Sequence, residues 1–82
     1  MLFEKIIEEK DILKYLMKRD LLSQYKKSKI YLLLGLFAKV NFGLREPKKD
    51  EIYYFRINRQ FRAYCIIKNN ELRIFEINNH QN

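Results

Sequence analysis

The chain has 82 residues, of which 48% are apolar and 33% are charged, a balance typical of one small folded domain. Its 17 basic and 10 acidic residues give a net charge of +7, which favours a polyanionic partner: nucleic acid, an acidic protein or an anionic membrane surface. The single cysteine, Cys65, excludes an internal disulfide, and with one histidine, His80, the chain cannot build a Cys/His zinc site.

The sequence also carries no signal for a membrane span or for secretion. Its longest apolar run, residues 30–38, falls far short of the ~20 residues that cross a bilayer. The N-terminus has an acidic residue, Glu4, where a secretory signal carries positive charge. We therefore expect a single soluble, cytoplasmic domain over residues 1–82, with no membrane partner, metal or cofactor.

The first half of the sequence predicts two helices. Ile12, Leu13, Leu16 and Met17 recur at helical spacing. A second apolar stripe at helical spacing comprises Leu22, Tyr25, Leu32, Leu33, Leu36, Phe37 and Val40. Two helices separated by two or three residues should form an antiparallel hairpin. The pattern leaves open whether residues 1–7 begin the first helix or form a short strand.

From Ile52 onward the period changes from about 3.6 to 2, and β-branched and aromatic residues dominate. Three strands fit, over residues 52–58, 61–68 and 72–78, with a turn at Asn69–Asn70. The expected fold is therefore α+β, with an N-terminal antiparallel helical hairpin on one face of a three- to four-stranded antiparallel β-sheet.

Residue parity predicts which face of that sheet is buried. The odd positions of the first two strands are apolar or aromatic: Tyr53, Phe55, Ile57, Phe61, Ala63, Cys65 and Ile67. A three-residue connection at 58–60 keeps residues of like parity opposite each other, and we expect Phe75 and Ile77 to continue the odd face. The even face should stay uncovered and carry Arg56, Arg62, Tyr64, Glu76 and His80.

This combination of side chains suits phosphate chemistry. Guanidinium groups donate two hydrogen bonds to phosphate oxygens, and a tyrosine ring can stack on a base. Histidine exchanges protons near neutral pH. The even face is therefore the predicted functional surface.

Three short segments make the pattern more specific: Tyr-Tyr-Phe-Arg-Ile-Asn at 53–58, Gln-Phe-Arg-Ala-Tyr at 60–64 and Ile-Asn-Asn-His-Gln at 77–81. Together with the small, basic, helices-then-strands layout, they resemble the RelE/ParE superfamily of type II toxin–antitoxin toxins. The resemblance extends from Ile12 to Gln81. It implies a toxin that cuts mRNA on the ribosome and so inhibits translation.

The resemblance also implies roles for individual residues. Arg62 matches an arginine that steadies the scissile phosphate, and Arg56 matches a basic position that contacts the RNA backbone. His80 falls where family nucleases place an arginine or histidine, and is expected to be the general acid. The lesser candidates are Glu76 as a base, Tyr64 and Tyr54 as RNA contacts, and Lys48 and Lys49 as phosphate contacts. The resemblance further implies a reaction without a metal ion, in which the mRNA 2′-hydroxyl attacks the neighbouring phosphate.

The expected partner is an acidic antitoxin protein that either covers the arginine-bearing face or displaces a helix, within a hetero-oligomer. Two departures from the family pattern keep other functions open. The usual strand before the hairpin is expected to be weak or missing, and the sequence ends at Asn82 where many of these nucleases carry a further tyrosine or histidine. The alternatives are a ParE-like inhibitor of DNA gyrase without nuclease activity, and an inactive relative that serves as a binding module.

Overall fold

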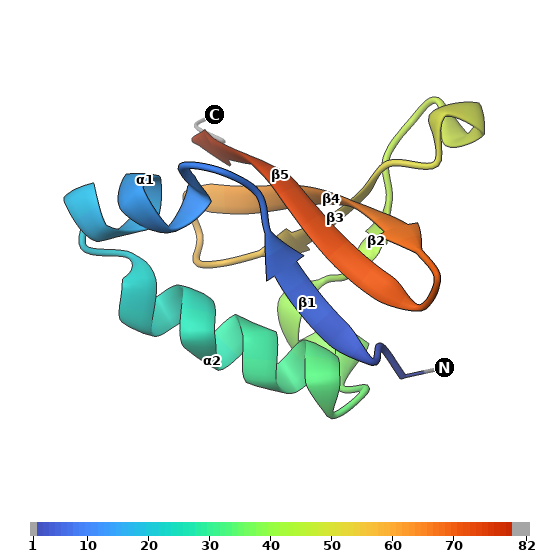
Figure 1. The fold of residues 1–82 in the computed structure, drawn as a ribbon, viewed down its shortest axis with the longest axis horizontal. Helices are drawn as coiled ribbons and strands as arrows, with labels where there is room; N and C mark the ends of the chain where they lie inside the picture. The colour runs from blue at the N-terminus through green and yellow to red at the C-terminus, as the bar shows by residue number, and fades with distance from the viewer. Residues whose placement is uncertain (1, 80–82) are drawn as a thin grey trace.

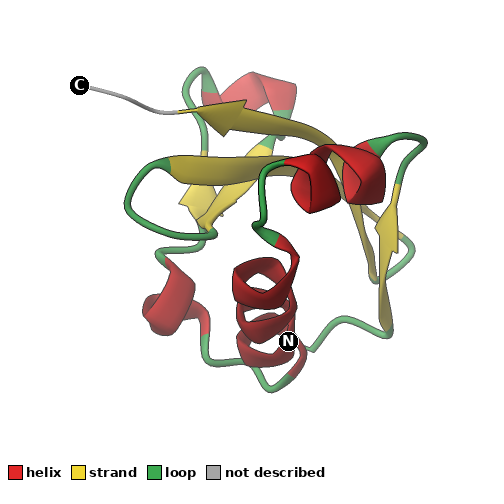
Figure 2. Cartoon of the chain, turned by 90° about the vertical axis from the view of Figure 1, so that its left-hand side faces the viewer, coloured by secondary structure: helices red, strands yellow, loops and turns green. Residues whose placement is uncertain are grey.

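Residues 2–79, which the computed structural model describes, form two α-helices on one side of a five-stranded β-sheet (Figures 1 and 2). In chain order the elements are β1 (Lys5–Glu8), α1 (Ile12–Lys18), α2 (Leu22–Leu33), β2 (Gly43–Leu44), β3 (Tyr53–Arg56), β4 (Phe61–Lys68) and β5 (Glu71–Asn79). Two short 3₁₀ helices, η1 (Phe37–Val40) and η2 (Lys48–Asp50), flank β2. The fold class is therefore α+β.

The sheet is mixed, with the strand order β1-β5-β4-β3-β2. The three predicted strands are present as β3, β4 and β5, each antiparallel to the next. The structure adds the two-residue β2 beside β3, and β1, which runs parallel to β5. A parallel pair needs a long crossover connection, and here the helices and all the other strands lie between the two partners in sequence. The expectation of an entirely antiparallel sheet was therefore wrong at β1.

The N-terminal segment is a strand, which answers the question that the sequence pattern left open. Ile6 lies opposite Leu72 of β5 and is buried. Hydrogen bonds extend the attachment at both ends, because Glu4 N donates to Asn70 O and Glu9 N donates to Ile74 O, each over 2.9 Å. One buried side chain and a ready backbone edge suffice to fix this short strand, although its sequence scarcely alternates.

The predicted register of β3 and β4 is confirmed. Arg56 lies opposite Arg62, so residues of like parity face each other. The connection is fixed by Asn58, whose Oδ1 accepts hydrogen bonds from the backbone N–H groups of Gln60 and Phe61, each over 2.8 Å. The turn at Asn69–Asn70 is also present, with φ values of 54° and 63° that asparagine tolerates.

The odd face does not continue through β5 as expected. Cys65 lies opposite Ile74 and Tyr64 lies opposite Glu76, so Phe75 is an extra residue in β5 at a β-bulge. Before the bulge, the buried residues of β5 are Leu72 and Ile74 at even positions, and beyond it Ile77 returns to the core. The prediction for Ile77 is confirmed, whereas that for Phe75 was wrong because the bulge reverses parity.

The second helix is shorter than its apolar stripe predicts. It ends at Leu33, because Gly35 adopts a φ of +77° and the chain turns away. Leu33 and Leu36 are consequently exposed, at 38% and 44%, instead of joining the core. The chain then forms η1, which returns Val40 to the interior at 2% exposure.

Helix α2 lies under the curved sheet, which arches over it in Figure 2. The Tyr25 ring packs against Phe55 of β3 with centroids 6.3 Å apart, and Leu16 and Leu32 are fully buried. The buried Ser28 donates a hydrogen bond to the Arg56 carbonyl over 3.0 Å, which joins α2 to β3. No helix in the described part of the chain has the length and apolar character to cross a membrane.

Candidate functional site

The two predicted site arginines lie together on the face of the sheet opposite the helices. Arg56 of β3 is directly opposite Arg62 of β4, and Arg62 is in turn opposite Asn78 of β5. Opposed residues on neighbouring strands have side chains about 4.5–5.5 Å apart at Cβ. The three residues therefore form a polar row across the end of the sheet.

No carboxylate in the described part of the chain forms an ion pair with the arginines of this row. Among residues 2–79 the ion pairs join Glu71 to Lys5 and to Arg73, and Glu8 to Lys29. The two Glu71 pairs, each at 3.4 Å, lie at the other end of β5. Like charges directly opposite each other repel, so the arginine row is a local positive potential that suits an anion.

Arg62 is held in place by the ring beneath it. Its guanidinium carbon lies 4.8 Å from the centre of the Tyr54 ring, a cation–π contact. The Tyr54 ring in turn occupies the space that Gly43 leaves open, since a Cβ at Gly43 would lie 2.9 Å from Tyr54 Oη. Gly43, Tyr54 and Arg62 thus form a stack that orients the guanidinium before any ligand arrives.

Tyr64 is on the predicted face but is not an open stacking surface. The residue is 9% exposed, and the Arg45 guanidinium carbon lies 4.8 Å from its ring centre. Glu76 lies opposite Tyr64, is exposed, and forms no ion pair with any residue the structure describes. Arg45 would have to move before a base could stack on Tyr64.

Within the described residues, the other predicted positions, Lys48 and Lys49, are not part of this arrangement. His80 lies outside the described residues. Lys48 and Lys49 are in η2, which precedes the start of β3, whereas Arg56 is its last residue. Figure 1 accordingly shows η2 and the end of β5 on opposite sides of the molecule. Lys48 and Lys49 are thus separated from the arginine row by the length of β3.

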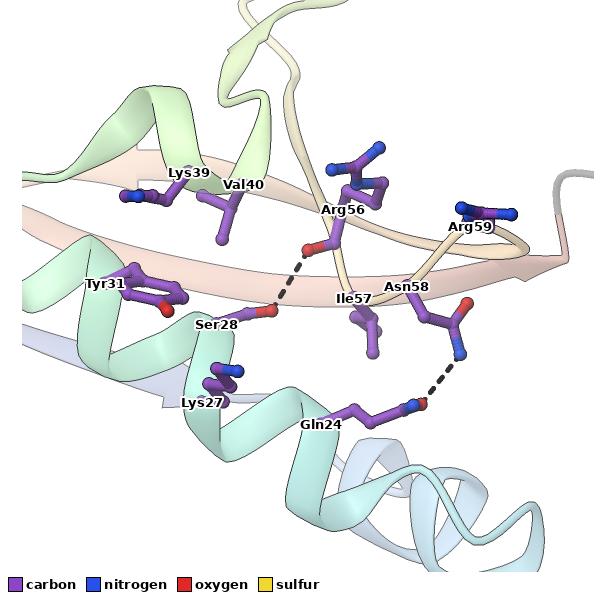
Figure 3. Close-up of a pocket in the computed structure, with 10 residues that line it drawn as sticks. All are labelled: Gln24, Lys27, Ser28, Tyr31, Lys39, Val40, Arg56, Ile57, Asn58 and Arg59. Carbon is purple, nitrogen blue, oxygen red and sulfur yellow. Dashed lines mark hydrogen bonds between the residues drawn. The ribbon is translucent and has the colours of Figure 1, made fainter.

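A groove of about 540 Å³ opens beside Arg56, between α2, η1 and the β3–β4 connection (Figure 3). Four of the residues that line it are basic: Lys27, Lys39, Arg56 and Arg59. None of the ten lining residues that the structure describes is acidic. Arg56 therefore contributes to both the arginine row and this groove.

Hydrogen bonds across the groove fix its walls. Asn58 Nδ2 donates to Gln24 Oε1 over 2.8 Å, which holds the β3–β4 connection to α2 (Figure 3). The Ser28 hydroxyl bonds the Arg56 carbonyl within the same groove. Lys27, Arg56 and Arg59 are therefore carried by segments that are already joined.

Sequence reasoning missed the groove and the supports of the arginine row. Neither Gly43 nor Arg45 was among the predicted site residues. Lys27, Lys39 and Arg59 come from three segments that the fold alone brings together. Their charge was visible in the sequence, but their proximity was not.

The cysteine of the chain is not placed for thiol chemistry at this surface. Cys65 is fully buried, and burial raises the pKa of its thiol to about 12. A thiol that stays protonated at neutral pH is a poor nucleophile. Within residues 2–79, no three histidine, cysteine, aspartate or glutamate side chains are grouped so that they could hold a metal ion.

Comparison with models of protein families and with curated proteins finds no match for this chain.

Proposed function

We propose that this protein is the toxin of a type II toxin–antitoxin system, similar to the RelE/ParE superfamily, and that it cuts mRNA on the ribosome. One observation carries the proposal: Arg56 and Arg62 lie opposite each other on an uncovered sheet face, without a carboxylate partner among the described residues. Two such arginines cost stability when nothing anionic is bound. A phosphate group between them removes that cost.

The arrangement of elements supports the same proposal. The resemblance implies a strand, a pair of helices and a meander of strands, in that order. The chain has β1, then α1 and α2 on one side of the sheet, then the meander β3-β4-β5. The strand that seemed weak or missing from the sequence is present as β1.

In the proposed reaction the 2′-hydroxyl of a ribose attacks the adjacent phosphorus. A P–O bond forms to the 2′-oxygen and the bond to the following 5′-oxygen breaks, leaving a cyclic or 3′-phosphate and a 5′-hydroxyl. Negative charge grows on the phosphate oxygens during attack, and Arg62 and Arg56 donate hydrogen bonds to them. The attacking hydroxyl gives up a proton and the departing 5′-oxygen receives one, for which the resemblance implies Glu76 and His80.

The stack beneath Arg62 helps this chemistry. Its cation–π contact with Tyr54 already restricts the long arginine side chain, so less conformational entropy is lost when phosphate binds. The net charge of +7 would meanwhile attract both RNA and an acidic antitoxin, with which we expect a salt-sensitive hetero-oligomer.

The proposal is tested by expressing the protein in cells and mapping the 5′ ends of their mRNA. Wild-type protein should stop growth and produce new ends inside translated reading frames. Arg62→Ala should lower cleavage by about 10²–10³-fold, because a positioned donor to the transition-state charge is lost. Arg62→Lys, which keeps the charge without the two-pronged geometry, should recover only part of it. His80→Ala tests the implied general acid in the same assay.

Lys68→Ala is the matched control, because it removes one exposed positive charge from the last residue of β4, whereas Arg62 lies near the start of that strand. It should leave cleavage unchanged. Growth arrest without new mRNA ends, together with loss of DNA supercoiling by purified gyrase, would contradict the nuclease and favour the ParE-like alternative. Harmless expression without an antitoxin would instead indicate an inactive relative.

A further inference from the structure

The groove beside Arg56 has the charge of an anion-binding site. Lys27, Lys39, Arg56 and Arg59 line it from α2, η1, the end of β3 and the following connection. Each of the four lacks an ion pair with the residues that the structure describes. Four cations without a counter-charge around one groove repel one another, and a bound polyanion would relieve that repulsion.

The groove is also continuous with the arginine row, because Arg56 belongs to both. Its carbonyl accepts the hydrogen bond from Ser28 inside the groove, and its side chain points away from Ser28 (Figure 3). That side chain lies on the face shared with Arg62, which is directly opposite on β4. An extended anionic chain with phosphate near Arg62 can therefore continue past Arg56 toward Lys27 and Lys39. An isolated small anion would occupy either the arginine row or the groove, but would not extend over both.

The lining favours a nucleic-acid backbone over an acidic peptide. The apolar residues Val40 and Ile57 are already 2% and 7% exposed, so they offer no pocket for an apolar anchor. Peptide segments that fold onto a surface depend on such anchors. Tyr31 and the Asn58–Gln24 amide pair instead provide a ring and polar atoms of the kind that contact ribose and base.

We infer that this groove binds the phosphodiester backbone of single-stranded RNA on one side of the scissile phosphate held by Arg62. The inference rests on the proposed function for the position of the cleaved bond. The assignment of the groove as a binding site requires only that single-stranded RNA binds there, whether or not it is cleaved. Lys27, Lys39 and Arg59 would each contact a phosphate and take no part in the reaction.

The test is the salt dependence of binding between the purified protein and a short single-stranded RNA, followed by fluorescence anisotropy. Each phosphate contact on a single strand contributes roughly 0.7 to the slope of log K against log salt. The variant Lys27→Ala/Lys39→Ala/Arg59→Ala should therefore bind more weakly, with a slope shallower by about 2 than that of wild type. Circular dichroism checks that it is folded.

The matched control is Lys14→Ala/Lys18→Ala/Lys68→Ala, which also removes three exposed positive charges, from α1 and the end of β4, none of them on a residue that lines the groove. It should keep nearly the wild-type slope. Equal slopes in the two triple variants, or no RNA binding by wild type, would overturn the assignment. Tighter binding of oligoglutamate than of RNA with the same number of charges would also overturn it, in favour of an acidic peptide.

A parallel cleavage assay on a translated message separates this inference from the proposed function. Groove-dependent RNA binding without any cleavage would contradict the nuclease and leave the groove assignment standing. If the message is cleaved but the triple groove variant binds RNA as wild type does, the groove assignment is contradicted and the nuclease proposal is not.

Discussion

The arginine row depends on a residue that has no side chain. Gly43 leaves room for the Tyr54 ring, and the Tyr54 ring carries the Arg62 guanidinium. A methyl group at position 43 would lie 2.9 Å from Tyr54 Oη, closer than such atoms pack, so the ring must move. Small displacements of a catalytic group have large effects on rate, whereas a shifted surface ring has a small effect on stability.

We therefore expect Gly43→Ala to lower RNA cleavage by on the order of 10- to 100-fold, while the free energy of unfolding in urea changes by less than about 1 kcal/mol. Tyr54→Phe in the same chain removes the hydroxyl that meets the new methyl, and should restore part of the activity. If Gly43→Ala is as active as wild type, or the second substitution has no effect, the stack does not position Arg62.

At the scale of single residues, the sequence predicted which face of the sheet a residue lies on better than it predicted side-chain contacts. Alternation placed Arg56 and Arg62 on one face and Phe55, Ala63 and Cys65 on the other, because period-2 patterning follows directly from strand geometry. The contact of Arg45 with Tyr64 was not predictable. It depends on where the connector before β3 passes over the sheet, which no local pattern encodes.

Among the secondary-structure elements, β1 and α2 are joined by a charged cluster of side chains. Glu8 accepts hydrogen bonds from the Tyr25 hydroxyl and from Lys29, whose Nζ lies 2.9 Å from Glu8 Oε2. Burial opposes ionisation of Glu8, but these hydrogen bonds and the charge of Lys29 outweigh it and hold the pKa of its carboxyl below the ordinary value. Burial and the adjacent Glu8 raise the pKa of Tyr25, which therefore stays a donor.

This cluster should make stability depend on acid. Because the pKa of Glu8 is lowered on folding, its contribution is fully present above about pH 5 and is lost as pH falls through the lowered folded value. Glu8→Gln removes the charge, and we expect it to cost about 1.5–3 kcal/mol at pH 7 and less at about pH 3. Urea unfolding of wild type and of Glu8→Gln across that pH range measures the free energy of unfolding of each protein. Parallel pH curves for wild type and Glu8→Gln would show that Glu8 is not the linked group.

Element types were more predictable than element ends. The strand boundaries 61–68 agree with β4 because asparagine turns flank a run of alternating residues. The second helix was predicted too long, since apolar spacing continues past Gly35 while the backbone does not. The bulge at Phe75 and the parallel β1 both depend on partners distant in sequence, so local periodicity could not reveal them.

At the scale of the whole molecule, the helices cover one side of the sheet and leave the other side to carry unpaired positive charge. The resulting surface runs from the arginine row, through Arg56, into the groove against α2. Long-range attraction by a net charge of +7 would bring polyanions to the protein, but only the arranged cations can fix one in register. The central claim is that this surface holds mRNA for cleavage beside Arg62.

The most direct measurement incubates purified protein with a defined message, with and without translating ribosomes, and identifies the products. The account predicts new fragments with a 5′-hydroxyl, formed when ribosomes are present, reduced about 10²–10³-fold by Arg62→Ala and retained by Lys68→Ala. A message that stays intact with wild-type protein and translating ribosomes would contradict it, and so would equal cleavage by wild type and Arg62→Ala.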